Sequence, residues 1–130
     1  MSQATSFGLS QIGQIAVTVQ DIDRAVRFYR DTLGMRMLFQ VPNMAFFDCG
    51  GVRLMLTLPE KDRPNELFSS IIYYKVADIQ GAYSALTARG VAFFQAPQFI
   101  AKMPDHDLWM AAFRDPENNV LELMSEVRGG

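Results

Sequence analysis

The residues able to do chemistry are few in this chain of 130 residues, which has one histidine, His106, and one cysteine, Cys49. A zinc site built from several cysteines or histidines therefore cannot form within one chain. The same count excludes an iron site of two histidines and one carboxylate. A catalytic pair of Cys49 and His106 remains possible by number, although a lone buried cysteine is usually a small core residue.

His106 stands in the sequence KMPDHDLW, between Asp105 and Asp107, just before an expected strand. Two neighbouring carboxylates would favour the charged form of the imidazole and hold its orientation. A loop at this place could lie over the mouth of a ligand site, which makes His106 a candidate catalytic residue. The alternative is an ordinary solvated loop histidine.

The elements that would position such residues follow from the spacing of apolar side chains. Residues 12–19 alternate as in a strand, and Asp21 can cap a following helix whose apolar stripe runs to Leu33. Gly34 ends that helix, as glycine does where a positive φ is needed. Three short strands are then expected, at residues 35–41, 44–49 and 52–58.

This βαβββ pattern occurs twice. Residues 59–70 are charged, contain two prolines and are typical of a linker. A strand (71–76), a helix between Asp78 and Gly90, and strands at 91–95, 108–114 and 120–124 follow, with an irregular loop expected at 96–107. Val19, Asp21, Ile22 and Ala25 recur as Val76, Asp78, Ile79 and Ala82, Gly34 recurs as Gly90, and Met55 aligns with Glu122.

Composition limits the function classes. The apolar fraction of 49% is ample for one domain spanning residues 1–130, and a net charge of −2 does not favour nucleic acid or an acidic membrane surface. The first ten residues lack the features of a signal peptide, and no apolar run is long enough to span a bilayer. One cysteine excludes an intramolecular disulfide. We therefore expect a cytoplasmic protein without nucleic-acid or membrane partners.

The two modules, residues 11–58 and 71–126, resemble the vicinal oxygen chelate superfamily. This group includes glyoxalase I, methylmalonyl-CoA epimerase, extradiol dioxygenases and the bleomycin- and fosfomycin-resistance proteins. The segments VTVQDIDRAVRFYRDTLGM and FRDPENNVLELM carry the resemblance most specifically. It implies an α+β fold of two tandem βαβββ modules whose sheets curl around a cavity. With short edge strands, it also implies a homodimer, with exchange of modules between chains as one option.

The resemblance further implies four metal-ligand positions, which fall on Gln14, Met55, Ile71 and Glu122 in this chain. Only Glu122 is a good ligand, because an amide oxygen is weak, a thioether is soft and isoleucine has no donor atom. We therefore predict no cofactor and no complete metal site. A divalent metal held weakly by Glu122 and water is the alternative.

Glu122 and Arg53 can act without a metal. A carboxyl group among apolar side chains holds its proton more tightly, so Glu122 is a candidate general acid or base. A purely structural carboxylate, bonded to Gln14 or Arg53, is equally compatible with the sequence. Arg53 shares a strand face with Met55 and can pair with Glu122 or with an anionic ligand, unless it is simply a surface arginine.

The remaining candidates would line the cavity. Gln14 can donate to a ligand carbonyl or to the protein itself, and Tyr73, which alternates with Ile71, offers a hydroxyl. Trp109 is either a core or dimer-interface residue or a stacking wall for a flat ligand. The predicted ligand-binding residues are therefore Gln14, Arg53, Met55, Ile71, Tyr73 and Trp109.

These residues favour a protein that binds a small apolar or aromatic molecule between its modules without a metal, as bleomycin-resistance proteins sequester their ligand. The first alternative is a metal-dependent lyase, isomerase or dioxygenase that uses Glu122. The second is a protein whose dimer surface is its function and whose cavity is filled by its own side chains.

Overall fold

The computed structural model describes residue 7, residues 10–59 and residues 71–128. Its secondary structure forms two βαβββ modules in tandem, as the internal repeat predicts. The first module comprises β1 (Gln14–Thr18), α1 (Ile22–Arg27), η2 (Phe28–Thr32), β2 (Arg36–Val41), β3 (Met44–Cys49) and β4 (Val52–Thr57). The second comprises β5 (Ile72–Lys75), α2 (Ile79–Ala88), β6 (Phe93–Lys102), β7 (Asp107–Arg114) and β8 (Val120–Val127). Except for Pro59, the predicted linker at 59–70 lies outside the described residues.

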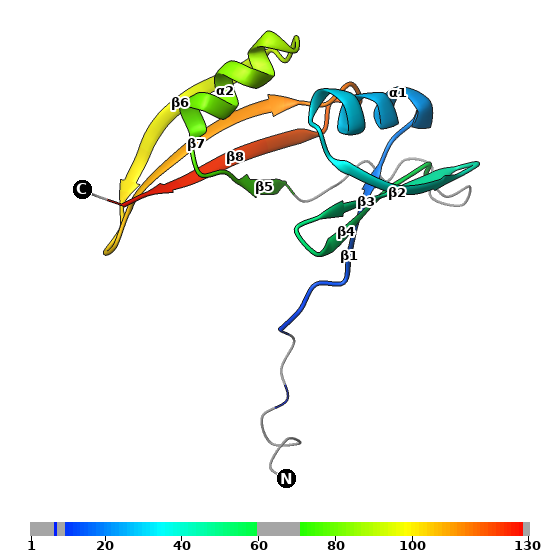
Figure 1. Ribbon diagram of the computed structural model, residues 1–130, viewed down its shortest axis with the longest axis horizontal. Coiled ribbons are helices and arrows are strands. Elements are labelled where there is room, and N and C mark those ends of the chain that lie inside the picture. Colours follow the sequence, from blue (N-terminus) through cyan, green and yellow to red (C-terminus); the bar gives the residue numbers. More distant parts are fainter. Residues whose placement is uncertain (1–6, 8–9, 60–70, 129–130) are drawn as a thin grey trace.

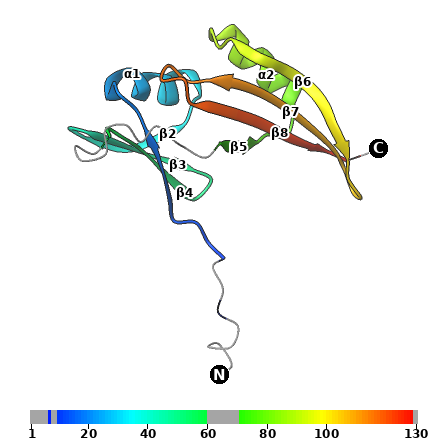
Figure 2. The ribbon, with the colours of Figure 1, turned by 180° about the vertical axis from the view of Figure 1, so that it is seen from behind.

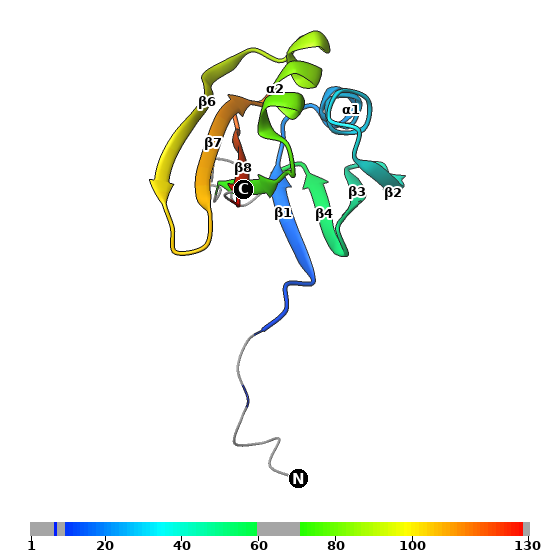
Figure 3. The ribbon, with the colours of Figure 1, turned by 60° about the vertical axis from the view of Figure 1, so that its left-hand side comes forward.

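Each module builds one four-stranded sheet, with strand orders β1-β4-β3-β2 and β5-β8-β7-β6. The first strand of each module pairs in parallel with the last, and the other pairs are antiparallel. Strands β1 and β5 are edge strands, and each is the strand of its sheet that lies toward the other module (Figure 3). Within the described residues no strand pairing joins the two sheets, so neither sheet closes into a barrel.

Both helices lie on one side of the molecule and the sheets lie beneath them (Figures 1 and 2). The alternation of the strands therefore gives each sheet a core face toward the helices and an open face away from them. Buried residues such as Val17, Leu54, Phe113 and Leu123 form the core face. The open faces carry Gln14, Phe46, Arg53 and Met55 in the first sheet and Tyr73, Met110, Glu122 and Met124 in the second.

The helix starts follow the predicted capping. The Asp21 side chain accepts a hydrogen bond from the backbone N–H of Arg24 at 3.0 Å, and Asp78 accepts one from Gly81 at 3.0 Å. Each cap satisfies one of the N–H groups that a helix start leaves without an internal partner. None of the helices in the described ranges is long and apolar enough to cross a membrane.

The first helix changes its winding before it ends. Helix α1 continues as a π-helix, η2, in which the N–H of Leu33 reaches the carbonyl of Phe28 at 2.9 Å. Such a turn inserts one residue more than an α-turn and is rare outside positions with a special role. Here the turn contains Tyr29, which is 1% exposed. Gly34 follows with φ of 74°, the left-handed conformation that the sequence predicts at the end of this helix.

The prediction of an irregular loop at residues 96–107 is wrong. Strand β6 runs through residue 102, and only a tight turn separates it from β7, closed by the N–H of Met103 on the carbonyl of His106 at 2.8 Å. Shifts of register along the β6–β7 pair absorb irregular residues. Strand β6 is also an edge strand, which within the described residues has β7 on one side only. A proline, which has no N–H to donate, is tolerated in such a strand, and Pro97 lies there.

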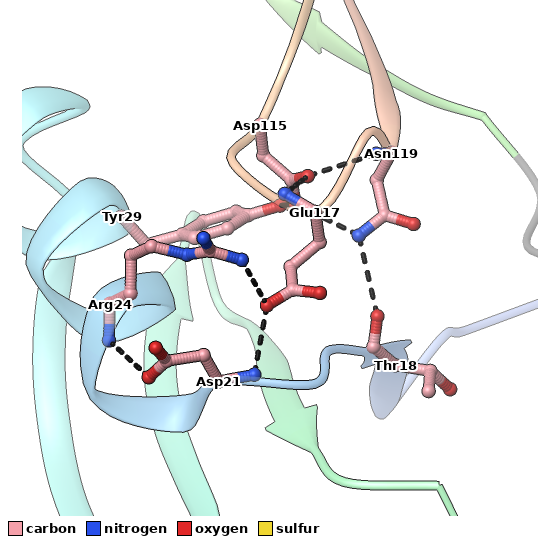
Figure 4. Close-up of polar contacts among 7 residues, drawn as sticks. All are labelled: Thr18, Asp21, Arg24, Tyr29, Asp115, Glu117 and Asn119. Atoms are coloured by element: carbon pink, nitrogen blue, oxygen red, sulfur yellow. Dashed lines mark hydrogen bonds and ion pairs between the residues drawn. The ribbon is translucent and has the colours of Figure 1, made fainter.

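The β7–β8 turn of the second module joins the two modules (Figure 4). The carboxylate of Asp115, which is 3% exposed, accepts hydrogen bonds from the Tyr29 hydroxyl at 2.9 Å and from the backbone N–H groups of Glu117 and Asn119. The Glu117 carboxylate accepts from the N–H of Asp21 at 2.8 Å and from Arg24 at 2.9 Å. Residues 115–119, with the sequence DPENN, therefore position the second module against the first helix.

Candidate functional site

On the open face of the first sheet, Gln14, Arg53 and Met55 form a connected cluster. Arg53 donates from Nε to the amide oxygen of Gln14 at 2.8 Å, and the Gln14 amide nitrogen lies 3.7 Å from the Met55 sulfur. A guanidinium group can only donate hydrogen bonds, so the Gln14 atom facing it is the oxygen. Two of the four predicted metal-ligand positions, Gln14 and Met55, are thus brought together, with Arg53 beside them.

Aromatic side chains continue this face. Phe46 lies directly across from Met55 in the β3–β4 pairing, and the Arg53 guanidinium lies 5.6 Å from the centre of its ring. Phe39 stacks on Phe46 with ring centres 4.5 Å apart and an angle of 23° between the planes. The first sheet therefore presents a stacked pair of aromatic rings next to a positive charge.

The other two predicted metal-ligand positions, Glu122 and Ile71, belong to the second module. Glu122 lies in β8 between Tyr73 of β5 and Ala112 of β7, and Ile71 directly precedes β5 with 44% of its surface exposed. Among the described residues, no side-chain hydrogen bond or ion pair involves Glu122. The four positions are therefore divided between two sheets that share no strand pairing in the described parts of the chain.

His106 lies at the turn between β6 and β7, far along the strand from Glu122. Ala112, the partner of Glu122 in β7, is six residues further on, which corresponds to about 20 Å of extended strand. The ring nitrogen of His106 lies 2.7 Å from Asp105, which also accepts from Arg128 at 2.8 Å. Arg128 and His106 hold the pKa of the Asp105 carboxyl down at about 2. Within one chain, the structure does not bring His106 and Glu122 together.

Trp109 and Cys49 are not placed on the open faces with the cluster. Trp109 packs against the core and meets Phe99 edge to face at 6.2 Å, which matches the core alternative for this residue. Cys49 ends β3 in the first sheet, while His106 belongs to the second sheet's hairpin. Burial, and then the charge of Asp48, raises the pKa of the Cys49 thiol, which disfavours the reactive thiolate.

A small cavity lies between the modules near Asp115. Its volume is about 10 Å³, which is about the size of one water molecule and too small for an organic ligand. Among the described residues, the hydroxyl of Tyr74 there is buried without a hydrogen-bond partner. The cavity is lined by Val17, Tyr29, Ile72, Tyr74, Asn119, Val120 and Leu121.

With this geometry, comparison with known proteins establishes the family. The model of the Glyoxalase/Bleomycin resistance protein/Dioxygenase superfamily matches residues 11–123. The chain belongs to this superfamily. Its sequence is 30% identical over 126 residues to the uncharacterized protein YraH of Bacillus subtilis, covering 85% of this chain and 94% of YraH. The predicted resemblance is thereby confirmed at the level of the superfamily.

Solved structures agree on the fold. A superfamily member from Sphaerobacter thermophilus aligns with a TM-score of 0.75 and 26% identity, over 91% of this chain and 98% of the other. Lactoylglutathione lyase from Agrobacterium tumefaciens aligns with a TM-score of 0.73 and 23% identity, over 91% and 95%. At 23% identity the similarity to the lyase establishes the fold alone.

The metal site that the superfamily implies does not fit these residues. The only oxygen donor in the first-sheet pair, the Gln14 amide, already accepts from a guanidinium whose positive charge would repel a metal ion. Met55 is a soft thioether and Ile71 has no donor atom. In the described parts of the chain, no three His, Cys, Asp or Glu residues lie close enough together to hold a metal. This set of donor atoms is therefore unsuited to a metal ion.

Sequence reasoning missed the aromatic part of this site. Phe46 and Phe39 were not predicted as ligand-lining residues, although alternation along residues 44–49 places Phe46 on the face opposite Ala45 and Phe47. That signal was available in the sequence. The stack of Phe39 on Phe46 was not, because it depends on a shift of register between β2 and β3 after Met37.

Proposed function

We propose that this protein binds a small apolar or aromatic molecule on the open faces of its sheets and acts as a homodimer. One observation carries the proposal: the open faces expose large apolar side chains. Phe39, Tyr73 and Phe94 are 48%, 46% and 55% exposed. Apolar surface interrupted by a few polar groups is typical of ligand pockets and subunit interfaces.

The proposed cover for these faces is a second copy of the chain. One chain has two different open faces and no strand pairing between its sheets in the described residues. A two-fold dimer can place the first sheet of one chain opposite the second sheet of the other, which creates two equal cavities. Gln14 and Arg53 would then orient the ligand from one chain, and Glu122 and Tyr73 from the other.

Ligand binding is proposed to need no metal and no other cofactor. The reason is that Arg53 already donates a hydrogen bond to the Gln14 amide oxygen, the atom that would otherwise bind a metal. The first test is elemental mass spectrometry on protein purified without chelator or affinity metal, before and after dialysis against Zn, Ni, Mn and Fe(II). We expect far less than one metal per chain in both samples. One tightly bound transition metal per chain would contradict the proposal.

The second test is a thermal-shift screen against a library of aromatic compounds, followed by calorimetry on the hits. We expect at least one compound to bind with one molecule per chain and without chemical change, and the protein to sediment as a dimer. A monomer, or a complete absence of binding across the library, would contradict the proposal. A cytoplasmic location and the absence of nucleic-acid and membrane partners remain proposals that rest on composition.

The second candidate function is a lyase, isomerase or dioxygenase that uses Glu122. It is favoured by the Glu122 carboxylate, which has no side-chain partner among the described residues and lies on a face with Tyr73. The similar Agrobacterium protein suggests lactoylglutathione as the first substrate to assay, with and without added Zn or Ni. Turnover that disappears in Glu122→Gln while the variant stays folded would favour this function. Activity unaffected by that substitution and by chelator would exclude it.

A further inference from the structure

Arg53 is held in one orientation on the open face of the first sheet. Its Nε donates to Gln14 at 2.8 Å, and the central carbon of its guanidinium lies 5.6 Å from the centre of the Phe46 ring. A long arginine side chain loses conformational entropy when it binds a ligand. Because Gln14 and Phe46 already restrain Arg53, part of that loss has occurred before a ligand arrives.

The charge of Arg53 is not neutralised within the described residues of the chain. The facing strand offers one carboxylate, Asp48, which lies directly across from Arg53 in the β3–β4 pairing. Asp48 is instead within 4.0 Å of Arg36 on the neighbouring strand. Among the described residues, no ion pair and no hydrogen bond involves the Nη1 or Nη2 atoms of Arg53.

The surroundings of this cation are aromatic and apolar. Phe46 and Phe39 form a stacked pair, and Met55 lies next to Phe46 in the adjacent strand. Phe39 itself is 48% exposed. A planar ring can pack against such a pair, stacked on the exposed Phe39 ring or edge to face, while a planar oxyanion on the same molecule forms two parallel hydrogen bonds to a guanidinium.

The geometry points to an aromatic carboxylate as the ligand, with its ring packed against the Phe39–Phe46 pair and its carboxylate bound by the two Nη groups of Arg53. Arg53 then supplies, as a fixed side chain, the positive charge that a metal ion would otherwise supply at this place. The inference rests on the proposed function and narrows it from apolar or aromatic molecules to anionic ones. Gln14 is a positioning residue, since it acts on the ligand through Arg53.

The experiment compares 2-naphthoate with 2-naphthamide, an uncharged molecule of the same shape, by calorimetry on the full chain at constant ionic strength. We expect the carboxylate to bind at least about tenfold more tightly than the amide, since hydrogen bonds between charged groups stabilise a complex more than neutral ones. Arg53→Gln should weaken the binding of 2-naphthoate by about tenfold to a hundredfold. It should change the affinity for 2-naphthamide by no more than about threefold.

Two further variants separate recognition from charge in general. Arg27→Gln removes the same charge from an exposed arginine of helix α1, on the other side of the first sheet, and should leave the preference for the carboxylate unchanged. Gln14→Glu keeps the shape of the side chain but places a carboxylate against Arg53, so it should abolish the preference while 2-naphthamide binding persists. Circular dichroism and the unfolding temperature of each variant establish that it is folded.

Three results would contradict this inference. Equal affinity for acid and amide, with Arg53→Gln without effect on either, overturns this inference but leaves the proposed function standing. Dissociation of the dimer in Arg53→Gln, with the preference for the acid retained, assigns Arg53 to an ion pair between chains and also overturns it. If neither probe nor any other aromatic compound binds, the proposed function fails together with the inference.

Discussion

At the scale of single residues, one buried carboxylate links the two modules. Asp115 receives hydrogen bonds from the Tyr29 hydroxyl, from two backbone N–H groups and from the Asn119 amide. A buried charge is tolerated only when such donors replace the water that it has lost. Burial, and then the charge of Asp115, raises the pKa of Tyr29, so its hydroxyl keeps its proton and remains a donor.

Tyr29→Phe should therefore lower the free energy of unfolding by about 1–3 kcal/mol, because it removes one donor to a buried carboxylate without leaving a cavity. Urea denaturation followed by circular dichroism measures the change. Tyr83→Phe is the matched control, since among the described residues the Tyr83 hydroxyl forms no hydrogen bond while its ring packs on Phe93. An equal effect of both substitutions would contradict the assigned role of Asp115.

The neighbouring Glu117 makes the same contact sensitive to acid. Loss of hydration raises the pKa of its carboxyl, but hydrogen bonds from the N–H groups of Gln20 and Asp21 and from Arg24 outweigh this and lower the pKa overall. A carboxyl with a lowered pKa in the folded state stabilises the protein above its unfolded-state pKa. That contribution is lost as the pH falls through the folded-state pKa.

We expect the stability of the wild-type protein to fall as the pH drops below about 4.5, and Glu117→Gln to be less stable at neutral pH but to show a shallower fall. Urea unfolding at a series of pH values between neutrality and 3 would measure both curves. Parallel curves for the wild type and the variant would mean that Glu117 gains nothing from Arg24 and the two N–H groups.

Contacts of this kind were the part of the site that the sequence could not predict. The hydrogen bond between Arg53 and Gln14 joins residues 39 positions apart, and the one between Tyr29 and Asp115 joins residues 86 apart. Alternation indicated which face Arg53 and Met55 share, but not that the Gln14 oxygen would accept from Arg53. Which atoms meet depends on strand register and on the packing of the modules, and neither is encoded locally.

At the scale of elements, local signals were sufficient. The two capping aspartates, Asp21 and Asp78, and the glycines that end the helices were predicted because each acts on backbone groups within a few residues of itself. Strand β6 was predicted too short because Pro97 within it and Pro104 after it indicate a break. Among the described residues, strand β6 pairs with β7 and has no strand on its other side, so it tolerates the proline. The local sequence does not show that β6 is an edge strand.

The caps give a direct prediction for α2. Asp78→Ala should lower the free energy of unfolding by about 1 kcal/mol, because it leaves the N–H of Gly81 without its side-chain partner. Asp78→Asn keeps an acceptor in the same place and should change stability by only a few tenths of that amount. Chemical denaturation of both variants measures the difference. A substitution by Asn that is as damaging as Ala would show that the charge, rather than the hydrogen bond, stabilises the helix.

At the scale of the whole molecule, the arrangement of the sheets explains why the chain alone has incomplete sites. The two modules meet through β1, β5 and the β7–β8 turn, on the side of the helices (Figures 3 and 4). The open faces are directed away from the helices, and each of them leaves aromatic side chains exposed. A cavity therefore requires a face from elsewhere, and a second copy of the chain offers one of complementary position.

This arrangement predicts that each ligand site combines residues of two chains, and subunit mixing tests it. Arg53→Gln removes the proposed anion contact in the first sheet, and Met124→Trp fills the open face of the second sheet beside Glu122. Each homodimer should bind 2-naphthoate at least about tenfold more weakly than the wild type, so that only wild-type sites are occupied at a low concentration of the ligand. A heterodimer with sites shared between chains carries one site with both changes and one with neither. After random mixing, about a quarter of the wild-type sites should thus return. Native mass spectrometry verifies that heterodimers have formed, and calorimetry counts the sites. If heterodimers form but no binding returns, each site lies within one chain, and the second copy is not part of it.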